Sequence, residues 1–79
     1  MTEYGLKCLQ RVEACGLARF YQEHVGNIII PECDFTPAIY IKVFAFLRNN
    51  PNWVFGYENP NGDCGYYWLN TIDTLRTGV

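Results

Sequence analysis

The spacing of apolar residues predicts a long first helix. Between residues 3 and 25, apolar side chains recur every three or four positions, as on one face of an amphipathic helix. Glu3 and Lys7 form a favourable i,i+4 pair, and Gly26 can end the helix in a left-handed conformation. A stripe about 140° wide collects the following residues at 100° per residue: Leu6, Leu9, Val12, Gly16, Leu17 and Phe20.

A second helix is predicted over residues 37–49. Thr36 followed by Pro37 has the form of an N-cap with proline in the first helical position. The sequence Asn49-Asn50-Pro51 is typical of a helix end. One arc of about 160° contains six apolar residues: Ile39, Tyr40, Val43, Phe44, Phe46 and Leu47.

Three strands are predicted from shorter patterns. Residues 27–31 form a β-branched run that ends in proline. Residues 53–58 and 64–72 form a hairpin, because Asn59-Pro60-Asn61-Gly62 between them favours a type I turn with Gly62 in the left-handed region. This turn would place Asn59 opposite Asp63. Residues 73–79 are expected to form a short turn or tail.

The predicted hairpin has two apolar faces, whereas a hairpin with one solvated side should alternate apolar and polar residues. In this register Tyr66 would cover Gly56, and Tyr57 would cover Gly65. One face carries Trp53, Phe55, Tyr57, Tyr67 and Leu69, and the other carries Val54, Cys64, Tyr66 and Trp68. We assign the first face to the core because its rings have the larger area.

These elements predict a single α+β domain over residues 1–79 with the order α-β-α-β-β. A small three-stranded antiparallel sheet would carry two helices packed on one face. In one alternative, the first helix covers the second hairpin face and makes three layers. A winged-helix-like arrangement is the other alternative, with residues 37–49 as recognition helix and only Lys42 and Arg48 to meet DNA.

Composition narrows the function classes. Of the 79 residues, 49% are hydrophobic and 16% aromatic, which excludes intrinsic disorder. Six basic and eight acidic residues give a net charge of −2 without a basic stripe, so nucleic acid is not an expected partner. We find neither a signal peptide nor an apolar run of the roughly 18–20 residues that would cross a bilayer. We therefore expect a cytoplasmic protein without a membrane partner.

The cysteines do not have the spacing of a metal site. Cys8, Cys15, Cys33 and Cys64 form neither a Cys-x-x-Cys nor a Cys-x-x-His pair. Cys8 and Cys15 would lie two helical turns apart, about 10 Å along the axis, which is too far for a disulfide. We expect four free thiols and neither a metal nor a cofactor, with a metal site or a redox pair as alternatives.

No residue pattern predicts an enzyme. The chain contains no serine, its carboxylates form no paired motif, and its hairpin glycines do not form a phosphate loop. His24 is expected to be a capping or surface residue near a helix end, with a role as base beside Cys33 or Cys64 as the alternative. Glu13, within the apolar stripe, is expected to reach water at its edge, with a partner-facing role as the alternative.

The aromatic residues favour a binding function. Two Trp and six Tyr belong to the types enriched in interface hot spots, although a small domain also fills its core with rings. We expect Tyr66, Trp68 and Val54 to contact a protein partner or a second copy of the chain, with Glu58 and Asn70 as a polar rim. Small chains of this kind are often inhibitors or accessory factors, including those with which phages and mobile elements block host defence or replication.

Overall fold

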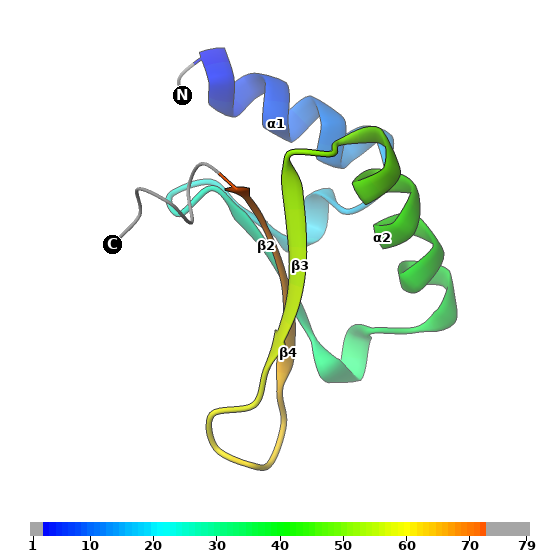
Figure 1. Cartoon of the computed structure of the whole chain (residues 1–79), viewed down its shortest axis with the longest axis vertical. Coiled ribbons are helices and arrows are strands. Elements are labelled where there is room, and N and C mark those ends of the chain that lie inside the picture. Colours follow the sequence, from blue (N-terminus) through cyan, green and yellow to red (C-terminus); the bar gives the residue numbers. More distant parts are fainter. Residues whose placement is uncertain (1–2, 73–79) are drawn as a thin grey trace.

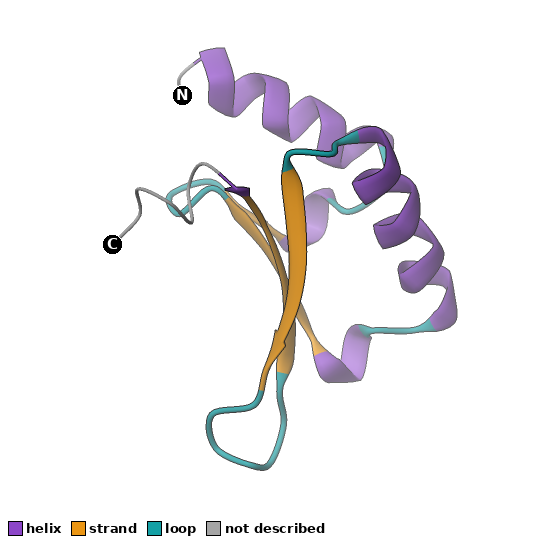
Figure 2. Ribbon diagram, viewed as in Figure 1, coloured by secondary structure: helices purple, strands orange, loops and turns teal. Residues whose placement is uncertain are grey.

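A computed structural model describes residues 3–72 as an α+β fold with two α-helices and a four-stranded antiparallel sheet (Figures 1 and 2). The class is as expected, but the sheet has four strands rather than three, in the order β1-β2-β4-β3. The expectation for residues 73–79 lies outside the described residues. In chain order the elements are α1 (Glu3–Ala14), the 3-10 helix η1 (Ala18–Phe20), β1 (Tyr21–Gln22), β2 (Asn27–Pro31), the 3-10 helix η2 (Glu32–Asp34), α2 (Pro37–Asn49), β3 (Trp53–Glu58) and β4 (Tyr66–Thr71).

The prediction of one helix over residues 3–25 is wrong beyond Ala14. Gly16 adopts φ 73° and ends α1, with its N–H donating to Glu13 O (3.0 Å) and the N–H of Leu17 donating to Val12 O (2.9 Å). These two bonds form a Schellman motif, and Val12 and Leu17 are both fully buried beside it. Gly26 instead serves the turn between β1 and β2, with φ 66°. The chain after Gly16 therefore folds back and adds a strand.

Helix α2 has the predicted bounds and the predicted cap. The Thr36 hydroxyl accepts a hydrogen bond from the N–H of Ile39 (3.3 Å), and Pro37 occupies the first turn. The buried stripe is narrower than expected. It consists of Ile39, Val43 and Phe46, while Tyr40 and Phe44 are 45% and 55% exposed.

Strands β2 and β3 have the predicted bounds, but the hairpin register differs from the prediction. Trp53 faces Thr71 and Phe55 faces Leu69, a shift of two residues. The turn around Gly62 is present, with φ 75° and the N–H of Gly62 donating to Asn59 O (3.4 Å). Residues 63–65, however, leave the ladder because Gly65 bonds to Glu32: Gly65 O accepts from Glu32 N–H (3.0 Å). Since the shift is even, every side chain keeps its predicted face.

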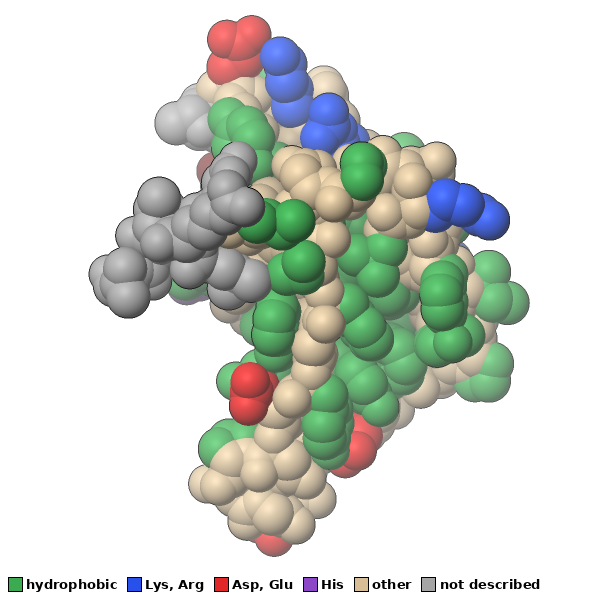
Figure 3. Space-filling view, viewed as in Figure 1, with side chains coloured by type: hydrophobic (Ala, Val, Ile, Leu, Met, Phe, Trp, Pro, Cys, Tyr) green, Lys and Arg blue, Asp and Glu red, His purple; other side chains and the backbone are tan. Residues whose placement is uncertain are grey.

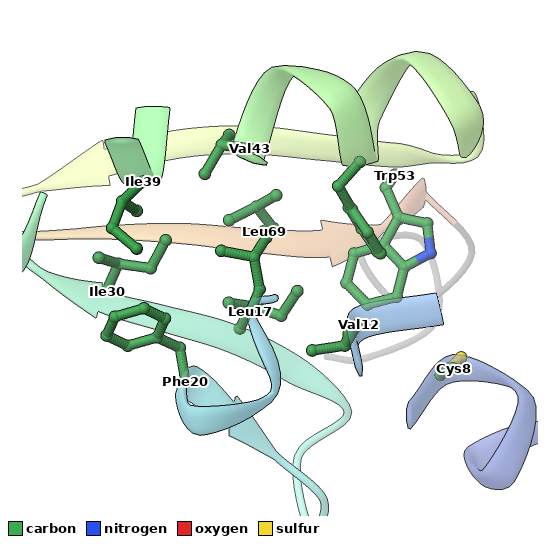
Figure 4. Close-up of a cluster of buried hydrophobic side chains, with 11 residues drawn as sticks. Cys8, Val12, Leu17, Phe20, Ile30, Ile39, Val43, Trp53 and Leu69 are labelled. Carbon is green, nitrogen blue, oxygen red and sulfur yellow. The ribbon is translucent and has the colours of Figure 1, made fainter. Parts of the chain in front are cut away.

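The core lies between α2, the η1 segment and one face of the sheet, with Cys8 and Val12 of α1 closing one end (Figure 4). Trp53 and Leu69 of the predicted inner face are buried there, and Tyr67 packs against the cluster. Since α1 joins this same core, the three-layer alternative is wrong. Phe55 and Tyr57 belong to the inner face but lie on the edge strand, 38% and 42% exposed.

Candidate functional site

The sheet face opposite the core gathers the predicted binding residues into one surface, which we call the outer platform. Across the strands, Ile29 of β2 pairs with Trp68 of β4, which pairs with Gly56 of β3. In the next row on this face Pro31 pairs with Tyr66. Adding Val54 of β3, the platform consists of Ile29, Pro31, Val54, Gly56, Tyr66 and Trp68.

Side chains of the platform do not contribute to the core. Ile29, Val54, Tyr66 and Trp68 are each half-buried, and none of them belongs to the core cluster or to the residues packed against it. In the described part of the chain, the platform is therefore an apolar surface without a covering layer.

Trp68 lies over the backbone of β3. A Cβ atom built on Gly56 would stand 2.5 Å from Trp68 Cε2, so the glycine leaves room for the indole. The expectation that a ring covers Gly56 is confirmed, but the ring is Trp68 rather than Tyr66, because of the register shift. Tyr57 covers Gly65 as expected, with its Oη 2.5 Å from a built Cβ.

The two predicted rim residues differ in exposure. Glu58 is exposed and lies opposite Tyr66 in the β3–β4 ladder. Asn70 is opposite Val54 but only 8% exposed, and its Oδ1 accepts a hydrogen bond from Thr71 N–H (2.8 Å). Asn70 therefore adds little polar surface, and Glu58 is the predicted residue that supplies charge beside the platform.

Sequence reasoning missed Ile29 and Pro31 as members of the platform. Both belong to the predicted strand 27–31, but the pairing partner of that strand was not specified by its sequence. The signal that could have found Ile29 is period-two alternation. Ile28 and Ile30 are fully buried and point into the core, so the residue between them faces the other way.

A second apolar surface lies on the core side, where β3 forms an edge of the sheet. Four exposed rings make up what we call the edge surface: Tyr40, Phe44, Phe55 and Tyr57. Tyr40 and Phe44 on α2 are in edge contact at 4.7 Å between ring centroids. Phe35 connects the two elements, with its ring 6.0 Å from both Tyr40 and Phe55. Figure 3 shows hydrophobic side chains between the β3 backbone and α2.

The Glu32 carboxylate forms hydrogen bonds at the end of the edge surface that lies nearest the hairpin loop. The Tyr57 hydroxyl donates to Glu32 Oε1 (2.7 Å), and Glu32 Oε2 accepts from Gly65 N–H (3.4 Å). The hydrogen bond to Glu32 is the main reason that the pKa of Tyr57 is raised above 10.0. Glu32 thereby holds one edge ring and the end of the hairpin loop together.

The remaining reactive side chains are dispersed. Cys8 is buried, Cys15 half-buried, and Cys33 and Cys64 exposed; burial raises the pKa of the Cys15 thiol. His24 is exposed in the β1–β2 turn rather than near a helix end, and Glu13 is exposed. Among residues 3–72, no group of three or more His, Cys, Asp or Glu side chains could hold a metal ion.

Basic residues do not form a common face on α2. Lys42 and Arg48 are separated by about 120° around the helix at 3.6 residues per turn. The Lys42 chain runs past Gly16, with Nζ 2.9 Å from a built Cβ there. In the described range 3–72, no helix is long and apolar enough to cross a membrane.

Comparison with known proteins gives no relative from which to transfer a function. No family model, curated protein or solved structure matches the chain.

Proposed function

We propose that this chain is a small protein-binding module that acts as an inhibitor or accessory factor of a larger protein or complex. In this proposal the outer platform contacts the partner, with Tyr66 and Trp68 as anchors and Val54 beside them. The observation that carries it is the close approach of the Trp68 indole to the backbone of Gly56, on a sheet face whose side chains do not belong to the core cluster.

The chemistry of the platform supports a protein partner. Its half-buried apolar residues adjoin one another on one sheet face, and contiguous apolar patches on monomers are often functional. Trp and Tyr held on a rigid sheet lose little conformational entropy on binding, and each can contribute about 2 kcal/mol or more. Glu58 gives the rim a negative charge, which favours a partner surface with a basic residue at that side.

An inhibitor or accessory role is the broader part of the proposal. Residues 3–72 bring together no metal-ligating cluster, and no pocket is formed within them that would hold a small substrate. A small domain with an apolar surface on one sheet face can act by occupying the surface of another protein. Blockage of a host defence or replication complex by a phage or mobile-element protein is one setting for such a domain.

The test uses a matched pair of surface variants. Wild type, Trp68→Ala and Ile41→Ala are used as baits in extracts of the native host, and captured proteins are quantified by mass spectrometry. Ile41 is a suitable control because it is 68% exposed on α2, away from the platform. The proposal expects a protein that is captured by wild type and Ile41→Ala and lost with Trp68→Ala.

Direct binding then decides the role of the anchor. With the purified partner, Trp68→Ala should raise the dissociation constant by about 30-fold or more, while Ile41→Ala leaves it unchanged. Both variants must still unfold cooperatively. Equal binding by Trp68→Ala would exclude the platform as the binding surface. Retention of the wild type on heparin at low salt would favour the nucleic-acid alternative.

A further inference from the structure

Strand β3 presents unpaired backbone groups along the edge of the sheet. Ile72 N–H donates to Asn52 O (2.7 Å), so the hydrogen-bonding pairs of the antiparallel ladder fall on Asn52 and every second residue after it. The N–H and C=O groups of Phe55 and Tyr57 consequently point away from β4. The Glu32–Gly65 hydrogen bond leads to the same assignment. It places the backbone N–H and C=O groups of Tyr67 and Leu69 toward β2, so these two residues do not bond to β3. Within residues 3–72, these four groups of Phe55 and Tyr57 have no hydrogen-bond partner.

This edge lacks the features with which proteins usually protect a free strand. Exposed edges are commonly short, bulged, or blocked by lysine or proline. Strand β1, at the opposite edge, is only two residues long. Strand β3 is six residues long, pairs without a bulge, and contains neither lysine nor proline. An edge of this kind is expected to be covered in the native protein.

The side chains beside the edge are suited to a second layer of rings. Phe55 and Tyr57 point to the core side of the sheet, and Tyr40 and Phe44 extend the same surface onto α2. All four remain between 38% and 55% exposed. A strand added to β3 would bring its own side chains over these rings.

We infer that the occupant of this edge is a second copy of the chain, paired antiparallel through β3 about a two-fold axis at Gly56. In this register Phe55 pairs with Tyr57 of the other copy, so the four unpaired groups of each copy make four intermolecular hydrogen bonds. The two Phe–Tyr pairs that result are of a favoured aromatic cross-strand type. The inference does not depend on the proposed function, because the outer platform stays open in the dimer.

Charge and area are compatible with this arrangement. The one charged residue of β3 is Glu58, which would face Val54 of the other copy rather than its own equivalent. Covering the exposed parts of the edge rings and the strand backbone in both copies would bury roughly 1,000 Å², near the lower limit for a specific interface. We therefore expect a reversible dimer with a continuous eight-stranded sheet.

The first test measures association by sedimentation equilibrium from 1 to 200 µM. Wild type is expected to sediment at twice the chain mass at the upper concentrations. Phe55→Lys should raise the dimer dissociation constant at least about 30-fold, because it places a charge among the paired rings. The control is Ile41→Lys, at a residue 68% exposed and outside the edge surface, which should dimerise like wild type. A wild type that is monomeric at 200 µM overturns the inference and leaves the edge for a strand of another protein.

The second test fixes the register and does not depend on the folding of Phe55→Lys. Val54 and Glu58 of opposite copies would form non-hydrogen-bonded pairs, about 4.5 Å between Cα atoms, which a disulfide can bridge. In a Cys33→Ser, Cys64→Ser background, the double variant Val54→Cys, Glu58→Cys should form a covalent dimer under mild oxidation. Each single variant should stay uncrosslinked. Equal crosslinking of the single and double variants would contradict the pairing about Gly56.

Discussion

The two tryptophans occupy opposite faces of the same sheet and show how differently those faces are used. Trp53 is 4% exposed and in edge contact with Phe46 of α2, at 5.0 Å between ring centroids. Trp68 is half-buried and rests on the backbone of Gly56, outside the core cluster. The same residue type is held by helix packing on one face and by a glycine on the other. Only the second arrangement leaves a ring surface available to a partner.

The largest expected effect separates these two faces by stability. Trp53→Ala removes a ring from the core and should lower the free energy of unfolding by about 3–5 kcal/mol. Trp68→Ala removes a half-buried ring and should cost about 1–2 kcal/mol, because less apolar area is lost. Urea unfolding monitored by circular dichroism measures both. Similar losses for the two variants would show that Trp68 belongs to the core after all.

Gly56→Ala tests the support beneath Trp68. The new methyl group would overlap the indole, so the ring must move away from β3, and we expect a loss of about 1–3 kcal/mol from this overpacking. The fluorescence of Trp68 should change as the ring moves. A matched control is Gly56→Ala in a Trp68→Ala background, where the destabilisation should become smaller because the clash is gone.

Gly62→Val tests the hairpin loop at a distance from both faces. Gly62 has φ 75°, and a Cβ there would meet no atom within 4 Å, so the cost is backbone strain alone. We expect a loss of about 1–2 kcal/mol, without a change in the fluorescence of either tryptophan. An unchanged melting temperature would contradict the left-handed conformation at this residue.

The thiols offer a smaller contrast between buried and surface positions. In the native protein, Cys33 and Cys64 should react first with a thiol reagent because both are exposed. Cys15 should react more slowly, since burial raises its pKa and lowers the thiolate fraction, and Cys8 should need opening of the core. In denaturant all four should react. Fewer than four reactive thiols in freshly prepared protein would indicate a disulfide or a modified cysteine.

The smallest effect concerns the Tyr57–Glu32 contact. The raised pKa of Tyr57 means that the folded state favours the neutral phenol. This contribution to stability is fully present below pH 10 and is lost as the pH rises through the higher folded value. The stability difference between wild type and Tyr57→Phe should therefore be constant from pH 6 to pH 9 and shrink above pH 10. A difference that grows above pH 10 would contradict the direction of the shift.

Features that depend on local chemistry could be predicted from the sequence. The start of α2 was predictable because the Thr36 side chain can accept a hydrogen bond from an N–H of the first turn and Pro37 has a φ angle that suits the first helical position. The strand Asn27–Pro31 was predictable from its β-branched residues. The faces of the hairpin were predictable even though its register was not. Side chains alternate with a period of two, so a slip of two residues moves no residue to the other face.

The candidate site was predictable to the same degree. Val54, Tyr66 and Trp68 share the outer face because of their alternation along the strands, which the sequence contains. Ile29 joins them only through the pairing of β2 with β4, and the edge surface exists only because β3 ends up at the sheet edge. Both depend on strand order, which no local pattern encodes.

Tertiary structure decided where the first helix ends and how the hairpin closes. Apolar spacing from residue 3 to residue 25 is compatible with a helix that stops at either glycine. The burial of Leu17 beside Val12 stabilises the stop at Gly16 and frees the following residues to form β1. In the same way, the contacts of Gly65 with Glu32 shift the β3–β4 register by two residues. The sequence determined which residues are apolar and at what period, whereas these long-range contacts selected one of several arrangements with that period, because their energy is gained only when distant segments meet.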